Sequence, residues 1–191
     1  MASWNTHDVF NQVDALCQQA PLQDDAALLH ALHRDGAAWS LSSQQDYALR
    51  VTAPATWQWA QQANPPPPNL QAFDARGRRI NTVHYHPCWH ALLTLLREQG
   101  LVGLPYESRR TGRWSAWAAG FYLHGQVEQG SLCPATMTTA AIGVLRKEPA
   151  LWAQVQSGLL SRRFDAQIRP WPDKQALCEG MGMTEKQGGS D

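Results

Sequence analysis

Four side chains of the types that ligate zinc lie within seven residues of one another, namely His84, His86, Cys88 and His90. Imidazole nitrogen and thiolate sulfur are the usual ligands of structural zinc. Pro87 turns the chain inside this group, so His84 and His86 share one strand face while His90 lies one turn into a helix. We therefore favour structural histidines, whose imidazoles satisfy polar groups at a helix end, and keep a metal site as the alternative.

The end of the sequence is rich in glycine and alternates small, hydroxyl-bearing and charged side chains. From Gly180 to Asp191 it reads Gly-Met-Gly-Met-Thr-Glu-Lys-Gln-Gly-Gly-Ser-Asp. Such runs present backbone amides to anions and to the polar edges of flat ligands, but they also form tight turns, and both interpretations stay open. A stable domain usually ends in a docked element or a polar tail, so we expect a truncated chain.

Other catalytic signatures are weak. His124 shares a helical stripe with Trp114, Trp117 and Phe121, a setting more typical of a hydrogen-bonded core histidine than of a ligand. The sequence has no GxSxG, HExxH or Walker lysine motif and no evident pair of carboxylates, so we assign no catalytic residue and no metal ligand.

Helices with clear start and stop signals position these residues. The four prolines at positions 65–68 favour an extended segment and divide the chain into two helical halves. In the first half we expect a helix with buried leucines that is capped by Asp24 or Asp25 and ends at Gly36. Two more are expected to begin near Ser42 and Pro54.

The second half begins with the single β element that the sequence predicts. Residues 70–73 and 78–85 flank the turn Asp74-Ala-Arg-Gly77, which indicates a short hairpin. Four helices should follow. Their expected ranges are Pro87 to Gly100 with Trp89, Leu92, Leu93 and Leu96 on one face, Arg113 to Gln129, Ala135 to Leu145, and one from Pro149.

Composition indicates a globular protein. The chain has 191 residues, 43% hydrophobic and 17% charged, with 16 basic and 16 acidic side chains. This length supports a core without disulfides or metal, and the zero net charge excludes a function based on a basic surface alone. Nine tryptophans should fill gaps between helices.

The cysteines and the apolar runs indicate the cellular compartment of the protein. Cys17, Cys88, Cys133 and Cys178 form no CxxC pair and follow no secretion signal, so we predict a reduced, cytoplasmic protein. No apolar run reaches the roughly 20 residues that span a bilayer.

Charge is uneven along the chain. Residues 1–60 are acidic overall, whereas residues 61–120 carry seven arginines against three acids. Either the two parts face each other, or the arginines form a surface for a phosphate-bearing partner.

The residues from Gly182 to Asp191 resemble the first signature of the acyl-CoA dehydrogenase superfamily, and the fuller run from Gly180 resembles its AidB-like branch. The similarity to that branch extends along nearly the whole chain. It includes Thr6-His7, Val9-Phe10-Asn11-Gln12, Asn64-Pro65-Pro66, Gly77-Arg78-Arg79, His86-Pro87, Trp89-His90, Gln126-Val127-Glu128 and Cys133-Pro134.

This resemblance implies a mainly α fold: the N-terminal helical domain of an acyl-CoA dehydrogenase with a short β-hairpin, plus the first residues of the β middle domain. Residues 1–179 would form the helical domain. Residues 180–191 would begin the FAD-contacting middle domain, which is truncated here. In the family, a C-terminal four-helix domain follows and supplies the catalytic base.

The resemblance also implies a site and a function. Thr184 would hydrogen-bond the flavin ring, and both Thr184 and Ser190 would meet the acyl-CoA substrate. The residues expected to contact FAD are Met181, Gly182, Met183, Thr184, Glu185, Lys186, Gln187, Gly188, Gly189 and Ser190.

The whole protein would be an FAD-dependent oxidoreductase of the adaptive response to DNA alkylation and of DNA repair. It would bind double-stranded DNA through its C-terminal domain, form a homotetramer and bind no membrane. The 191 residues alone would lack activity because the base is absent. The alternative is an autonomous helical interaction module with no redox role.

Overall fold

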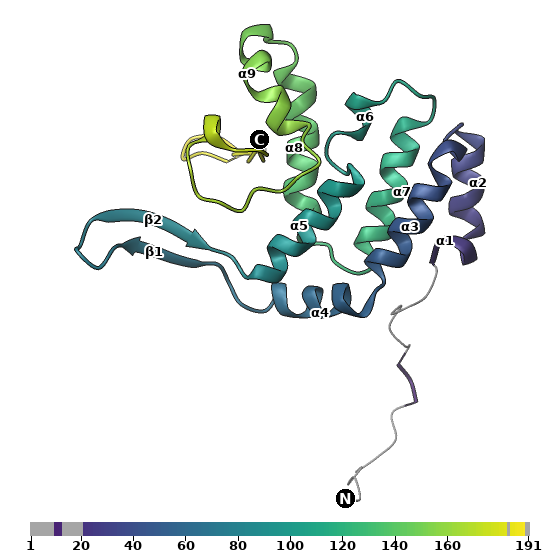
Figure 1. The fold of residues 1–191 in the computed structure, drawn as a ribbon, viewed down its shortest axis with the longest axis horizontal. Coiled ribbons are helices and arrows are strands. Elements are labelled where there is room, and N and C mark those ends of the chain that lie inside the picture. Colours follow the sequence, from purple (N-terminus) through teal and green to yellow (C-terminus); the bar gives the residue numbers. More distant parts are fainter. Residues whose placement is uncertain (1–9, 13–20, 183, 190–191) are drawn as a thin grey trace, which may run out of the picture.

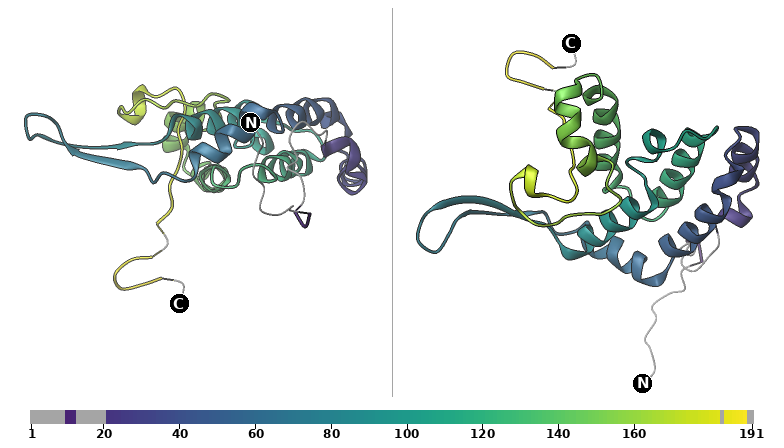
Figure 2. Two further views of the ribbon diagram at one scale, coloured as in Figure 1. Left: turned by 90° about the horizontal axis from the view of Figure 1, so that it is seen from below. Right: turned by 45° about the horizontal axis from the view of Figure 1, so that its top comes forward.

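The structure, a computed structural model, describes residues 10–12, 21–182 and 184–189. Its helices form a flat array from which a two-stranded hairpin extends (Figure 1), and Figure 2 shows this array edge-on. The helical elements are α1 (Pro21–Asp24), α2 (Ala26–Arg34), η1 (Ala38–Ser40), α3 (Leu41–Val51), α4 (Pro54–Ala63), α5 (Pro87–Gln99), α6 (Leu104–Glu107), α7 (Arg113–Gly125), α8 (Leu132–Leu145), α9 (Pro149–Leu159) and η2 (Trp171–Asp173). None of these helices combines the length and the apolar character needed to cross a membrane.

The helices of the first half follow the predicted signals. Asp25 caps α2 by accepting a hydrogen bond from the backbone N–H of Leu28 at 2.8 Å. Gly36 follows that helix with φ of +75°, a left-handed conformation that glycine adopts without strain. The prediction of a mainly helical fold with helices near Ser42 and at Pro54 is confirmed by α3 and α4. The short elements α1 and η1 were not predicted.

Helix α5 supplies the centre of the core. Leu92, Leu93 and Leu96, which lie three, four and seven residues after Trp89, are buried as their helical spacing predicts, whereas Trp89 itself is half-buried. Gly100 ends the helix in the left-handed conformation with φ of +85°. The helix connects the base of the hairpin to the middle of the array (Figure 1).

The start of α7 packs backbone against backbone on the turn that follows α2. Gly112 is the N-cap of α7 and has φ of +72°. A Cβ atom at this position would stand 2.6 Å from both the nitrogen of Ala37 and the carbonyl oxygen of Asp35. Ser115 reinforces the contact by donating its hydroxyl to Asp35 Oδ2 at 2.8 Å. This junction leaves no room for a side chain at residue 112.

The prediction of one helix from Arg113 to Gln129 is wrong at its end, because α7 ends at Gly125. The chain turns where the carboxylate of Glu128 accepts hydrogen bonds from the backbone N–H groups of Gly130 and Ser131. A side chain that binds nearby backbone donors competes with continuation of a helix.

Helix α8 begins earlier than predicted, at Leu132 rather than at Ala135. Pro134 therefore lies inside its first turn, where the N–H that proline lacks has no helical acceptor in any case. Helix α9 begins at Pro149 as expected.

The hairpin pairs β1 (Asn69–Phe73) with β2 (Arg79–His84) in antiparallel register, with Leu70 opposite Val83. Its turn is held by Asp74, whose Oδ1 accepts the N–H groups of Arg76 and Arg78 at 2.8 and 2.9 Å. The predicted hairpin is confirmed, although the register shifts between Gln71 and Phe73. Asn81, on the facing strand, has φ of +47°, as expected of an extra residue in a bulge.

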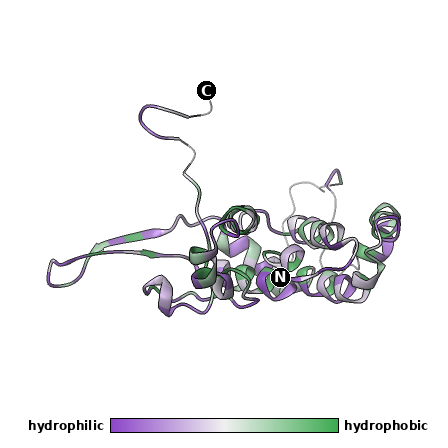
Figure 3. Ribbon diagram, turned by 90° about the horizontal axis from the view of Figure 1, so that it is seen from above, coloured by the Kyte–Doolittle hydropathy of each residue, from purple (hydrophilic) through white to green (hydrophobic). Residues whose placement is uncertain are grey.

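The hairpin stands clear of the helices (Figure 1), and parts of its strands have the colour of hydrophobic residues in Figure 3. Its exposed large hydrophobic residues are Leu70, Phe73, Ile80, Val83 and Tyr85. A two-stranded sheet with neither face buried is marginally stable in water, so this surface is suited to a partner.

The prediction that tryptophans fill gaps between helices holds for some of them, whereas Trp114 and Trp171 are 47% and 46% exposed. Trp117 of α7 donates its indole N–H to the carbonyl oxygen of Leu101, just beyond α5, at 2.8 Å. Its ring also lies against Phe121, with centroids 4.2 Å apart. Among the described residues, the ion pair between residues 1–60 and 61–120 joins Arg50 to Glu98, so the base comes from the acidic part and the acid from the basic part.

Candidate functional site

The predicted flavin-contact segment lies beyond the helices as an exposed stretch of chain. Its described residues are Met181, Gly182, Thr184, Glu185, Lys186, Gln187, Gly188 and Gly189, and each is exposed. Met183, Ser190 and Asp191 lie outside the described residues. The backbone N–H of Glu185 donates to the carbonyl of Gly188 at 2.9 Å and closes a tight turn. The described residues of the segment are therefore open to a ligand.

The chain just before this segment is tied to the helical array. The backbone N–H of Leu177 donates to the carbonyl of Gly158 in α9 at 3.0 Å. The backbone N–H of Glu179 donates to Oγ1 of Thr138 in α8 at 3.1 Å. Leu177 is buried, whereas Met181 is 55% exposed, so the chain passes from the helical array into solvent within four residues.

Arg97 of α5 completes this tie, and sequence reasoning missed it. Its side chain is 2% exposed. One guanidinium nitrogen, Nη1, donates to the carbonyls of Leu159 and Ser161 at 3.0 and 3.1 Å. The other, Nη2, donates to the carbonyl of Leu177 and contacts Sγ of Cys178 at 3.4 Å. The available signal was the position of Arg97 four residues after Leu93, which places it on the buried face of α5.

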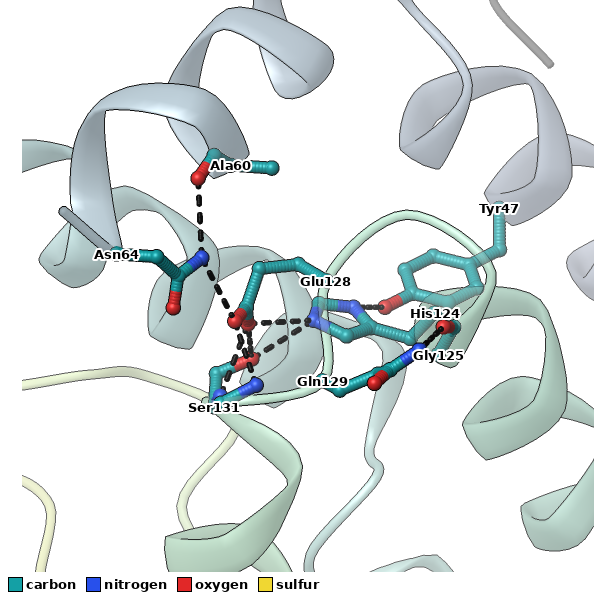
Figure 4. A network of polar contacts seen from close by, with 9 residues as sticks. Tyr47, Ala60, Asn64, His124, Gly125, Glu128, Gln129 and Ser131 are labelled. Carbon is teal, nitrogen blue, oxygen red and sulfur yellow. Dashed lines mark hydrogen bonds and ion pairs between the residues drawn. The ribbon is translucent and has the colours of Figure 1, made fainter. Parts of the chain in front are cut away.

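The most concentrated polar cluster is a buried chain of four side chains (Figure 4). Tyr47 Oη lies 2.6 Å from His124 Nδ1, and His124 Nε2 lies 2.8 Å from Ser131 Oγ. Ser131 donates its hydroxyl to Glu128 Oε2 at 2.5 Å. Since that proton is committed to Glu128, Ser131 accepts from His124 Nε2–H, and Nδ1 accepts from Tyr47. Each member thus has a partner, which confirms the prediction of a hydrogen-bonded core histidine.

Glu128 is the anionic end of this cluster, with a side chain only 1% exposed. Burial alone raises the pKa of its carboxyl, but the nearby His124 ring, whose Nε2 lies 3.8 Å away, and hydrogen bonds from Ser131 and the backbone N–H of Gly130 outweigh burial and lower the pKa to about 2. Asn64 Nδ2 also approaches Glu128 Oε1 at 3.3 Å. The cluster is closed to water, so it holds the turn between α7 and α8 rather than acting on a substrate.

Stability should therefore fall in acid as this carboxylate is protonated. The lowered pKa means that Glu128 stabilises the fold above its unfolded pKa of about 4.5, by roughly 3 kcal/mol, and that this contribution disappears as the pH falls towards 2. Urea unfolding at about pH 6 and about pH 3 should show that the chain loses roughly 2 kcal/mol more than the Glu128→Gln variant does. An equal loss in both proteins would refute the assignment.

The histidines and the cysteine near the hairpin take separate partners. His84 Nε2 meets a glutamine of β1 at 3.0 Å, and Cys88 Sγ meets a glutamine of α4 at 3.2 Å. His86 Nδ1 accepts the N–H of Cys88 at 3.2 Å and so caps α5, the helix-end role that the sequence favoured. Within the described ranges, no three His, Cys, Asp or Glu side chains are grouped to hold a metal ion. Cys88, Cys133 and Cys178 are free thiols, and Cys17 lies outside the described residues.

An open hollow of about 410 Å³ lies between the end of β2, the start of α5 and the loop after α9. Tyr85 and Trp89 stack in its lining with ring centroids 4.3 Å apart, and Phe164 meets Trp89 edge-on with centroids 6.3 Å apart. Arg169 and Lys174 also line the hollow. Among the described residues predicted to contact FAD, none lines this hollow.

Comparison with known proteins places the chain within a family. A family model described as the adaptive response protein AidB N-terminal domain matches residues 11–166. Putative acyl-CoA dehydrogenase AidB of Escherichia coli K12 is 42% identical over 190 residues, which cover 98% of this chain and 35% of that protein. Acyl-CoA dehydrogenase family member 11 of Caenorhabditis elegans is 28% identical over 130 residues, 65% of this chain and 20% of the relative.

Two solved structures share the fold. The apo form of Bd2924 matches with a TM-score of 0.76 and 28% identity, over 93% of this chain and 35% of that one. The C. elegans ACDH-11 complex with C11-CoA matches with a TM-score of 0.73 and 26% identity, over 100% of this chain and 32% of that one. The chain spans about a third of the length of the AidB relative. It belongs to the family of the adaptive response protein AidB N-terminal domain, with an acyl-CoA dehydrogenase-type fold.

Proposed function

We propose that this chain is the N-terminal helical part of an FAD-dependent, acyl-CoA dehydrogenase-like protein of the AidB type that acts in the adaptive response to DNA alkylation. The observation that carries the proposal is the 42% identity to the AidB protein of E. coli over 98% of this chain. The names of both curated relatives support an acyl-CoA dehydrogenase relationship.

Two units make up the chain in this proposal. Residues 1–179 form the helical domain, and residues 180–191 begin the FAD-contacting middle domain. The ties of Leu177 and Glu179 to the helices support a boundary at this point. The described part of residues 180–189, which leaves the helical array (Figure 2), supports it as well.

Residues 181–190 are the proposed flavin contact, with Thr184 bonding the ring and both Thr184 and Ser190 close to an acyl-CoA substrate. The backbone fits such a role, because no atom lies within 4 Å of where a Cβ of Gly180 or Gly182 would stand. A flat ligand can thus approach the amides closely. When bound, FAD supplies a hydride acceptor.

The remaining partners belong to the proposed whole protein. We propose that double-stranded DNA binds through a C-terminal domain, that the protein is a cytoplasmic homotetramer, and that the catalytic base lies outside these residues. Two described carboxylates whose pKa is lowered, Glu128 and Asp165, are poor candidates for a base. Glu128 is sealed in the core, and hydrogen bonds from the N–H groups of Gln175 and Gln167 lower the pKa of Asp165.

A visible spectrum tests the proposal. The product of the complete gene, including any residues that follow Asp191, should take up FAD and turn yellow. Thr184→Val should weaken FAD binding by roughly fivefold, the effect of one lost hydrogen bond of about 1 kcal/mol. Thr136→Val is the matched control, because the Thr136 hydroxyl bonds only within α8, to the carbonyl of Leu132. A colourless protein that binds no added FAD would refute the proposal.

The exposed apolar residues of the hairpin favour a second candidate, an autonomous helical interaction module. This candidate predicts that the 191-residue chain is folded and soluble by itself and that FAD has no effect on it. Failure of the chain to fold alone would count against it.

A further inference from the structure

The end of the helical domain is held by one arginine, and we infer that Arg97 is a positioning residue for the flavin-contact segment. It determines where that segment leaves the helical array. This inference rests on the proposed function, because it takes residues 181–190 as the part of the chain that meets FAD.

The environment of Arg97 is unusual for a charged group. Its side chain is 2% exposed, and no ion pair among the described residues includes it. A buried cation without an anion is costly unless dipoles replace water around it. Backbone carbonyls supply these dipoles, and the carbonyl of Leu159 lies at the end of α9, where helix carbonyls lack helical partners and attract positive charge.

The guanidinium group joins two chain segments that are far apart in sequence. Nη1 bonds the carbonyls of Leu159 and Ser161, at the exit of α9. Nη2 bonds the carbonyl of Leu177, just ahead of the flavin-contact segment. Only the planar fork of arginine presents donors in two fixed directions, because a lysine ammonium is a single point of charge. Arg97 therefore holds both ends of the loop between them at a set separation.

Two independent contacts restrict the same three residues. Leu177 packs so closely on α9 that a Cβ on Gly158 would stand 2.7 Å from its Cγ. The backbone N–H of Glu179 reaches Thr138 Oγ1, which itself bonds the carbonyl of Pro134 within α8. Residues 177–179 are thus tied to α5, α8 and α9. Beyond them, no atom lies within 4 Å of where a Cβ of Gly180 or Gly182 would stand.

This arrangement suits a segment that must meet a cofactor. Binding groups have to be held within about 0.5 Å of their working position by supporting contacts. Loss of the Arg97 fork would leave Leu177 held by one backbone hydrogen bond and packing, so the start of the flavin-contact segment could shift while the helices stay folded.

The test compares FAD affinity in the complete gene product and its variants. Arg97→Met should raise the Kd for FAD by about tenfold and shift the spectrum of bound flavin towards that of free FAD. Arg97→Lys should restore the affinity only in part, because its single point of charge cannot bridge both segments. Arg163→Met is the matched control, since Arg163 lies on the same loop and its side chain donates only to Gln175, and it should leave both readouts unchanged. Equal affinities and spectra for Arg97→Met and Arg163→Met would overturn the inference.

Hydrogen exchange separates this inference from the proposed function. In Arg97→Met, the amides of Leu177 and Glu179 should exchange about tenfold faster, while the amides of Leu93 and Leu96 keep their protection. If the unaltered protein takes up no FAD, the proposed function fails and exchange alone decides whether Arg97 is an anchor. Should Arg97→Met fail to fold, Thr138→Val removes the acceptor of Glu179 without a change of charge. It should accelerate exchange at Glu179, and unchanged exchange there would refute the tie.

Discussion

Replacing Gly112 by alanine should lower the free energy of unfolding by roughly 3 kcal/mol, one of the largest effects expected of any single substitution in the chain. Two costs combine. The left-handed φ of +72° is unfavourable for alanine, and the new Cβ would stand 2.6 Å from backbone atoms of Asp35 and Ala37. Backbone cannot move aside as a flexible side chain can, so the junction of α2 and α7 must open. Urea or thermal unfolding followed by circular dichroism measures the loss.

Gly77→Ala separates the two costs. Gly77 in the hairpin turn has nearly the same φ, +74°, but no atom lies within 4 Å of its missing Cβ. This variant should lose only the conformational part, about 1 kcal/mol. Equal losses at Gly112 and Gly77 would show that the contact with the turn after α2 is unimportant.

Glu128→Ala should cost about 3–5 kcal/mol, as expected when one member of a buried charged network is deleted. The substitution removes the acceptor of two backbone N–H groups, at Gly130 and Ser131, and of the Ser131 hydroxyl. Those donors would be left in the core without partners and beside a cavity. Equilibrium unfolding in urea near neutral pH measures the cost.

Glu98→Ala is the matched control for that prediction. Glu98 pairs with Arg50, but both side chains are about half exposed, at 47% and 49%. Exposed ion pairs contribute about 0–1 kcal/mol, so this variant should remain close to the unaltered chain. A Glu128→Ala variant as stable as Glu98→Ala would mean that water enters the turn and replaces the carboxylate.

The sequence predicts the helical elements well where local signals decide them. Proline at a first turn begins α4, α5 and α9, and glycine with positive φ follows α2 and ends α5. The hairpin turn is similarly local, because Asp74 binds donors two and four residues along the chain. In these cases the residues that determine the structure are close neighbours in sequence.

Prediction fails where the deciding partner is distant in sequence or belongs to a network. The end of α7 is an example, because the predicted helix runs on to Gln129 whereas α7 ends at Gly125. Glu128 accepts backbone N–H groups of the turn that follows, and the spacing of apolar residues contains no sign of this contact. His124 meets Tyr47 across 77 positions, and Arg97 meets Leu177 across 80. Spacing rules contain no information on such pairs. The contacts of residues 181–190 with FAD stay a prediction.

The position of Arg97 has a consequence for how the chain folds during synthesis. Nη1 finds its acceptors at Leu159 and Ser161, but the acceptor of Nη2 at Leu177 is made 80 residues after the arginine. Until Leu177 arrives, Nη2 must stay hydrated, which keeps this end of α5 from being fully buried. Contacts of such high sequence separation form late in folding. Completion of the core should therefore wait until the ribosome has released the residues around Leu177, and a nascent chain that stalls earlier would expose apolar surface to chaperones.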